Sequence, residues 1–294
     1  MEHHTPTPIT GHTALICLLG SPCAHSISPM MHNASFEALG LDYRYLAFDV
    51  NEATLPTAVA GLKVLGARGF NLTMPDKNLM VSLCDDLSTA ARIIGAVNTV
   101  VNENGRLIGH NTDGIGYMQS VKDAGYDIIG KKMTLLGAGG AATAILVQAA
   151  LDGLKEISIF VRPTSRFYDR LVHTVDELTK ITDCKIKICD FSDAELLKQE
   201  LADSAILTNG TSVGMAPHED TCPVPEDLVF PDGLIVSDII YNPRKTRLLS
   251  MAKHQGNPFF NGSYMLLYQG AEAFRLWTGK EMPVEHIKRE FFSI

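Results

Sequence analysis

The sequence predicts an α/β protein of two domains, the first with a mostly parallel sheet and the second doubly wound. The 294 residues are enough for about two domains of ordinary size. Strand patterns alternate with helical patterns from Ala14 onward, and the alternation restarts at Lys132. A glycine-rich turn follows the first strand of that second series. These observations favour two successive α/β units over a single core.

Short apolar runs rich in β-branched or aromatic residues predict the strands of the first domain. They lie at Ala14–Leu19, Tyr43–Val50 and Ala67–Leu72. Ser28 followed by Pro29 is typical of a helix start, with Ser28 as the N-cap. Further helices are predicted at 52–65 and, opened by Pro75, after the third strand.

The turn Asn104-Gly105 predicts an antiparallel pair at the end of the first domain. It separates the runs Val97–Val101 and Arg106–Ile108, and Asn-Gly is a strong signal for a two-residue hairpin. The first domain is therefore expected to span residues 1–113.

The second series predicts a doubly wound sheet over residues 114–264. Its strand candidates are Met133–Leu136, Ile157–Val161, Lys185–Cys189, Ala205–Thr208 and Leu234–Ser237. The remaining stretches, Met265–Trp277 and Pro283–Phe292, have helical spacing and belong to neither strand series. We expect the segment 265–294 to return and complete the first domain.

Composition limits the classes of function. Hydrophobic residues at 46% and charged residues at 20% are typical of a soluble globular protein. The formal charge of −8 offers no basic field for nucleic acid or an anionic membrane. Apolar runs such as 141–150 are too short to cross a bilayer, and residues 1–10 lack a signal peptide's apolar stretch. We expect a cytoplasmic protein without nucleic-acid or membrane partners.

The cysteines and histidines do not indicate a metal site. The six cysteines form no CxxC pair, which favours reduced thiols. The ten histidines are scattered, and the pair His3-His4 is more typical of a frayed terminus than of a ligand pair. No metal is therefore expected.

A GxGxxA motif lies between a predicted strand and a predicted helix. Its residues are Gly137, Ala138, Gly139, Gly140, Ala141 and Ala142. Glycines there allow the backbone to approach a pyrophosphate, which the amino end of the helix attracts. The motif predicts a Rossmann-type dinucleotide-binding domain; the alternative is a close-packed turn that binds nothing.

The end of the second Rossmann strand favours NADP over NAD. An NAD-selecting unit usually carries an acidic residue there, to bond the ribose 2′-hydroxyl. Here the strand runs instead into a segment containing Arg162 and Arg166, whose guanidinium groups could clamp a 2′-phosphate. The alternative is two solvated arginines at the start of the next helix.

Lys77 is a candidate general base in the first domain. It follows Pro75 by two residues, so we expect it in the first turn of a helix, where the helix dipole disfavours a cation. That position would favour the neutral amine a base requires, while Asp113 would favour the charged form and orient it. Of the two serines after the first strand, Ser26 is the better ligand candidate, because Ser28 has a role as N-cap.

Together these segments resemble the shikimate dehydrogenase family, including its quinate/shikimate branch, along nearly the whole chain. The matching segments include His25-Ser26-Ile27-Ser28-Pro29, Asn71-Leu72-Thr73-Met74-Pro75-Asp76-Lys77, Asn111-Thr112-Asp113, Tyr241-Asn242-Pro243 and Gln269-Gly270-Ala271. The resemblance implies that Lys77 and Asp113 are catalytic. It implies substrate contacts from Ser26, Ser28, Thr73, Asn98, Asp113, Tyr241 and Gln269. It also places Ile239 and Gly262 on the cofactor side.

The implied activity is reversible NADP-linked reduction of 3-dehydroshikimate to shikimate, a step toward chorismate and the aromatic amino acids. Two alternatives stay open: a quinate/shikimate dehydrogenase that uses NAD, and a non-catalytic dinucleotide-sensing regulator. Val161 and Thr164 depart from the residues that the family's NADP-selective and NAD-using members usually carry. Both cofactors therefore remain possible, and the chain is expected to be a monomer or homodimer.

Overall fold

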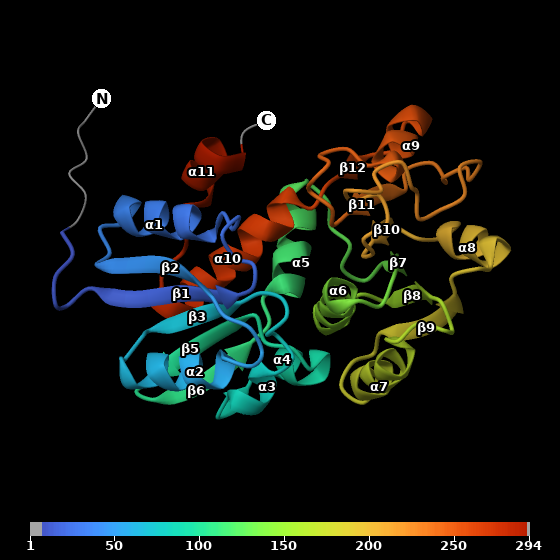
Figure 1. Ribbon diagram of the computed structural model, residues 1–294. Coiled ribbons are helices and arrows are strands. Elements are labelled where there is room, and N and C mark those ends of the chain that lie inside the picture. Colours follow the sequence, from blue (N-terminus) through green and yellow to red (C-terminus); the bar gives the residue numbers. More distant parts are fainter. Residues whose placement is uncertain (1–7, 293–294) are drawn as a thin grey trace. The chain divides into compact units, whose positions relative to one another are not determined.

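Strands and helices alternate along most of residues 8–292, the part of the chain that the computed structural model describes (Figure 1). Two units form. The first comprises the described residues up to Thr112 and from Gln269 onward, and the second comprises Asp113–Tyr268. Each contains its own six-stranded sheet. The pair His3-His4 lies outside the described residues.

The sheet of the first unit has the strand order β2-β1-β3-β5-β6-β4. The strands are β1 (Ala14–Gly20), β2 (Tyr43–Asp49), β3 (Gly69–Leu72), β4 (Asp86–Leu87), β5 (Thr99–Glu103) and β6 (Arg106–His110). The helices are α1 (Ser28–Ala38), α2 (Leu55–Val64), α3 (Met80–Leu83), α4 (Thr89–Ile94) and α11 (Val284–Ile287), which continues into a π-helical turn at Lys288–Phe292. Only β5 runs antiparallel to its neighbours, so the prediction of a mostly parallel sheet is confirmed.

Helix α2 covers one face of this sheet because its apolar residues recur at helical spacing. Leu55, Val59 and Leu62 are buried against Cys17 and Phe70 of the sheet. Each such buried side chain stabilises the fold by roughly 1.5–3 kcal/mol. Helix α1 and the end of α10 (Ser263–Thr278) lie on the other face (Figure 1).

That other face holds an aromatic cluster, which we define as His32, Phe36, Tyr45, Phe274 and Trp277. The imidazole of His32 stacks on Tyr45 with 4.6 Å between ring centroids. Trp277 donates its indole N–H to the carbonyl of Val100 at 2.9 Å, which satisfies its one polar group. The cluster packs the end of α10 against the first sheet.

Of three local predictions for the first unit, the structure confirms the hairpin and corrects the starts of two helices. The hairpin is confirmed, and Asn104 and Gly105 have the positive φ angles of 53° and 91° that such a turn needs. Helix α2 begins at Leu55 and not at Glu52, because residues 52–54 form turns. The helix predicted to open at Pro75 was wrong: residues 74–79 form successive turns, and α3 begins only at Met80.

The second unit contains an all-parallel sheet with the order β12-β11-β10-β7-β8-β9. The strands are β7 (Lys132–Leu136), β8 (Glu156–Val161), β9 (Lys185–Asp190), β10 (Ile206–Asn209), β11 (Ile235–Asp238) and β12 (Phe259–Phe260). The helices are α5 (Asp113–Asp123), α6 (Gly140–Leu151), α7 (Tyr168–Thr179), α8 (Ala194–Leu201) and α9 (Arg247–Gln255), and α10 begins here. Counted within the unit, the order is 6-5-4-1-2-3, as in Rossmann folds. The predicted doubly wound fold is confirmed.

A network of ion pairs lies toward the amino ends of the strands of this second sheet. Glu200 is buried and pairs with Lys132 at 2.8 Å, with Lys187, and with the hydroxyl of Ser158. Burial alone would raise the pKa of Glu200, but hydrogen bonds from these three groups lower it to about 2. The network therefore supports the fold, on the sheet edge opposite the glycine-rich turn.

Candidate functional site

The predicted substrate residues of the first unit lie on connections at the carboxyl ends of its parallel strands. Ser26 and Ser28 follow β1, and Thr73 and Lys77 follow β3. The amide of Thr73 donates to the carbonyl of Leu19 in β1 at 2.9 Å. The parallel register of β1 and β3 thus brings the two connections to one edge of the sheet.

The two serines have structural roles that differ from those predicted. The N-cap of α1 is Ile27, which makes no side-chain capping bond, and Ser28 is the first helical residue. The prediction that Ser28 caps the helix was therefore wrong. Instead, the hydroxyl of Ser26 accepts a hydrogen bond from the amide of Ser28 at 3.2 Å. Ser26, which was expected to have no structural role, thus orders the turn before α1.

The side chain of Ser28 is hydrogen-bonded to the buried Tyr45. Burial raises the pKa of Tyr45 well above its usual value, and a hydrogen bond with Ser28 opposes that rise. The same phenol donates to the amide oxygen of Asn71 at 2.8 Å, and Asn71 donates to Thr99 at 3.0 Å. Ser28 therefore stands at one end of a chain of buried hydrogen bonds through the sheet.

Asn98 stands at the other end of that chain. Its amide oxygen accepts from the hydroxyl of Thr99 at 3.0 Å and from the amide of Thr112 at 2.9 Å. Its amide nitrogen donates to the hydroxyl of Thr112 at 3.1 Å. The connection that carries Asn98 is thereby fixed to Thr112, the residue directly before Asp113.

Lys77 lies in the turn between β3 and α3 and is half-buried. Its carbonyl oxygen accepts from the amide of Val97 at 2.8 Å, so its backbone is fixed beside the connection that carries Asn98. Because α3 begins three residues later, the helix-dipole argument for Lys77 does not hold. Asp113 is half-buried and begins α5, a helix that the sequence pattern did not predict.

Asp76, directly before Lys77, was not singled out by its sequence. Its side chain is 0% exposed, and neither carboxylate oxygen has a hydrogen-bond partner among the described residues. Burial raises its pKa, and the nearby charge of Glu52 raises it further. A buried carboxylate without partners destabilises the folded state.

Replacing Asp76 by asparagine is therefore expected to stabilise the protein. The raised pKa means that stability falls as the pH rises through it, since the folded state holds the proton more tightly than the unfolded chain. Above that pH, Asp76→Asn should raise the free energy of unfolding, because it removes the buried charge. Urea unfolding at pH 7.5 measures this, with the exposed, ion-paired Asp86→Asn as control. A lower stability of Asp76→Asn would contradict the account.

The glycine-rich turn of the second unit has the geometry that a pyrophosphate site requires. Gly137 has a φ of 97°, and Gly139 is the N-cap of α6. Apart from their chain neighbours and the backbone of α6, no heavy atom of the described residues lies within 4 Å of the positions that a Cβ would take at Gly139 or Gly140. The backbone is thus open to an anion at the amino end of α6. Ala138 is buried and Ala141 half-buried.

Arg162 and Arg166 follow β8 and are exposed. The guanidinium carbon of Arg166 lies 4.7 Å from the ring centroid of Phe167, which orders that side chain. The amide of Ser165 donates to the carbonyl of Arg162 at 2.9 Å and closes the loop. Both cations are thus carried on the loop at the carboxyl end of the second Rossmann strand.

The last predicted site residues follow β11 and β12. The amide of Ile239 donates to the carbonyl of Asn209, and Tyr241 is 50% exposed. Gly262 packs so closely on Ile239 that a Cβ there would overlap the carbonyl group of Ile239. Gln269 is half-buried on α10. The structure thus places each predicted residue on a turn, strand end or helix of its own unit.

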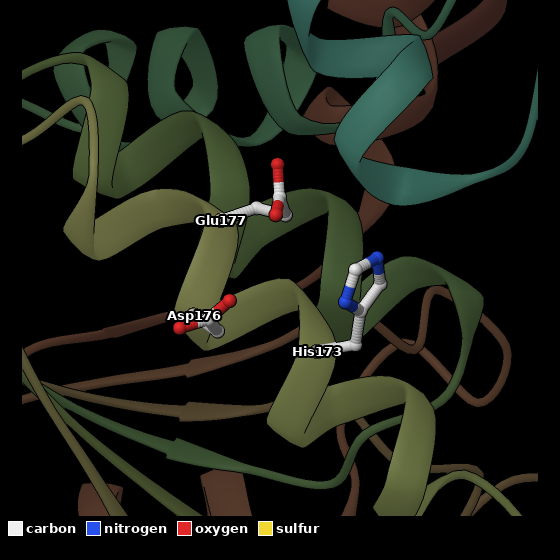
Figure 2. A group of neighbouring side chains, drawn as sticks. All are labelled: His173, Asp176 and Glu177. Atoms are coloured by element: carbon white, nitrogen blue, oxygen red, sulfur yellow. The ribbon is translucent and has the colours of Figure 1, made fainter.

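One cluster of potential metal ligands lies on α7, among the residues that the structure describes. His173, Asp176 and Glu177 have ligand atoms within 4.8 Å of one another (Figure 2). Both carboxylates pair with Lys180 at 2.7 Å, and all three side chains lie on the surface of one helix. This is the pattern of a solvated helix face, and we assign no metal to it. No helix within residues 8–292 combines the length and the apolar character needed to cross a membrane.

The strand order and the glycine-rich turn place the second unit among the Rossmann-type dinucleotide-binding domains. Comparison with sequence families is more specific. The family described as "Shikimate dehydrogenase substrate binding domain" matches residues 18–100, and "Shikimate 5'-dehydrogenase C-terminal domain" matches residues 262–290. The chain belongs to the shikimate dehydrogenase family.

Individual relatives agree over nearly the full length. The NADP(+)-dependent shikimate dehydrogenase of Listeria monocytogenes serotype 4b is 54% identical over 285 residues, 97% of each chain. A quinate/shikimate dehydrogenase of Escherichia coli is 44% identical over 281 residues, 96% of this chain and 97% of that protein. A crystal structure of shikimate 5-dehydrogenase from Listeria monocytogenes in complex with shikimate and NAD has a TM-score of 0.92 at 53% identity, and covers 96% of this chain and 98% of that one.

Proposed function

We propose that the chain catalyses the reversible NADP-linked reduction of 3-dehydroshikimate to shikimate, a step toward chorismate and the aromatic amino acids. The observation that carries the proposal is the 54% identity, over 97% of both chains, to a shikimate dehydrogenase named for NADP(+). Residues 1–113 with the segment 265–294 would bind the ring acid, and residues 114–264 would bind the cofactor. The test is an assay of shikimate oxidation with each nicotinamide cofactor.

Lys77 and Asp113 would carry the proton chemistry. In shikimate oxidation, Lys77 removes the proton of the ring hydroxyl, and it returns that proton in the reduction of the ketone. Asp113 orients the lysine and the hydroxyl. The cofactor, when bound, supplies the hydride acceptor or donor. Gly137, Gly139 and Gly140 would hold its pyrophosphate, an assignment that the open space at the last two supports.

Fixed polar groups would select a polyhydroxylated acid. Ser26 and Ser28 would bond its carboxylate. Thr73, Asn98, Tyr241 and Gln269 would bond hydroxyl groups or close over them, while Ile239 and Gly262 would contact the cofactor. The buried hydrogen bonds that fix Ser28 and Asn98 support this assignment, because they hold both side chains before any ligand arrives.

Arg162 and Arg166 would select NADP through its 2′-phosphate. Replacing both by alanine is expected to weaken NADP+ binding by ~10–100-fold, through loss of two charge-assisted contacts. Binding of NAD+ should change by less than about threefold, because it lacks the phosphate. Titrations of each nucleotide measure the effect, with exposed Arg92→Ala as the control. Equal losses for both nucleotides would count against the clamp.

A second candidate is a quinate/shikimate dehydrogenase that uses NAD. The 44% identity to the Escherichia coli protein of that name and the NAD in the Listeria crystal structure favour it. Its predicted site residues are the same, so only substrate and cofactor preference separate the two candidates. For either, we propose a cytoplasmic monomer or homodimer that acts on small molecules.

A further inference from the structure

Asp238 is a buried carboxylate at the cofactor edge of the second unit. It ends β11, is 1% exposed and pairs in register with Asn209, the last residue of β10. Burial raises its pKa to about 6, hydrogen bonds oppose the rise, and no charged side chain among the described residues contributes. An isolated buried charge persists only where hydrogen bonds compensate its lost hydration.

Three segments of the chain supply those hydrogen bonds. One carboxylate oxygen accepts from the amide of Ile240 at 3.0 Å and from the side chain of Asn209 at 3.1 Å. The other accepts from the hydroxyl of Thr246 at 2.8 Å, and Thr246 is the N-cap of α9. Asp238 thus joins the loop after β10, the loop after β11 and the start of α9.

The bond to Asn209 extends toward the glycine-rich turn. The amide oxygen of Asn209 accepts from the backbone amide of Thr211 at 3.0 Å and from its hydroxyl at 2.7 Å. The methyl group of Thr211 lies against Gly137, where it would meet any added Cβ. The carboxylate is therefore two hydrogen-bonded residues away from the turn that would hold the pyrophosphate.

The bonds to Ile240 and Thr246 shape the loop after β11. This loop carries Ile239 and Tyr241, and Gly262 donates its amide to the carbonyl of Ile240 at 3.1 Å. Rossmann folds bind the two halves of a dinucleotide on their two βαβ halves, and β10 and β11 belong to the second half. The loops that Asp238 joins therefore border the nicotinamide half.

We propose that Asp238 is a positioning residue that holds the loops after β10 and β11 in the geometry that binds the nicotinamide half of NADP. The inference rests on the proposed function. The proposed role depends on the positions of the hydrogen-bond acceptors and not on the negative charge. In Asp238→Asn, the amide oxygen can accept from Ile240 and Asn209, and the amide nitrogen can donate to the hydroxyl of Thr246. Alanine leaves all three donors without their acceptor.

The test is direct NADP+ titration of the full-length wild type, Asp238→Asn and Asp238→Ala, at a temperature where all are folded. Asp238→Ala is expected to bind NADP+ at least ~10-fold more weakly, and Asp238→Asn within about threefold of wild type. In steady state, the KM for NADP+ should rise in Asp238→Ala and stay within about threefold of wild type in Asp238→Asn.

A matched control separates positioning from loss of stability. Glu200→Gln breaks the buried network at the opposite edge of the same sheet, so it should lower stability and leave NADP+ affinity unchanged. Equal NADP+ affinity in Asp238→Ala and wild type would overturn the inference alone. If Glu200→Gln lost as much NADP+ affinity as Asp238→Ala, that result would also overturn the inference. So would a loss of NADP+ affinity in Asp238→Asn as large as the loss in Asp238→Ala. No NADP+ binding by the wild type would overturn the proposed function as well.

Discussion

Replacing Lys77 by alanine is expected to lower kcat for shikimate oxidation by ~10²–10⁴-fold, the usual range for loss of a positioned acid or base. The structure fixes the backbone of Lys77 beside Asn98 through the bond from Val97, and it leaves the side chain half-buried. NADP+ affinity should stay within about threefold, because the groups proposed to bind that cofactor lie on other elements. Steady-state kinetics and an NADP+ titration measure the two effects.

Lys63→Ala is the matched control for that experiment. Lys63 lies in the same unit, its side chain is 40% exposed and it pairs with Asp85 at 3.1 Å, so its loss should change kcat by less than about twofold. Near-normal turnover in Lys77→Ala would remove Lys77 from the mechanism. A loss in Lys63→Ala of similar size would indicate a general effect of lysine removal on this unit.

His32 is expected to make the protein sensitive to acid. It is 0% exposed in the aromatic cluster, and neither ring nitrogen has a hydrogen-bond partner among the described residues. Burial lowers its pKa from 6.5 to about 3. Between pH 6.5 and 3, His32 binds a proton in the unfolded chain but not in the folded protein. The neutral imidazole is therefore fully compatible with the fold above pH 6.5, and up to about 5 kcal/mol of stability is lost as the pH falls toward 3.

Replacing His32 by phenylalanine should remove this pH dependence, because phenylalanine fills a similar volume without a titrating group. Unfolding free energies of both proteins between pH 3 and 7.5 test it, with the fluorescence of Trp277 as reporter of the same cluster. The difference between them should grow in favour of the variant as the pH falls. A difference in unfolding free energy between the two proteins that stays constant from pH 3 to 7.5 would contradict this expectation. So would an equal loss of pH dependence in the variant His12→Ala, whose histidine is exposed.

The sequence pattern predicted the strands of both sheets except the two-residue strands β4 and β12, because most of the others are buried runs with strong β-branched or apolar character. The pattern did not predict helix starts correctly where tertiary contacts determine the local structure. Pro75 has the position of a helix start, yet the chain turns from Thr73 to Asp76, whose amide donates to the Thr73 carbonyl, and begins α3 later. Helix α5 was missed because Gly114 and Gly116 interrupt its apolar pattern, although both are buried.

The sequence likewise indicated some groups of the candidate site and missed others. Residues in motifs, such as Lys77 and the glycines after β7, could be found from local spacing and context. The hydrogen bonds from Tyr45 to Asn71, or from Asn209 to Asp238, could not, because each joins residues that are far apart in sequence. Nor does any local pattern indicate that Asp76 is buried without a partner. Such groups become visible only when the sheet register is known.

Oxidation of shikimate with NADP+ is the activity that we propose for this chain. The most direct test measures the absorbance of reduced nicotinamide with shikimate or quinate, each with NADP+ and with NAD+, using the full-length protein. We expect the highest kcat/KM for shikimate with NADP+. No reduction of either nucleotide by shikimate, with the protein folded and binding NADP+, would contradict it.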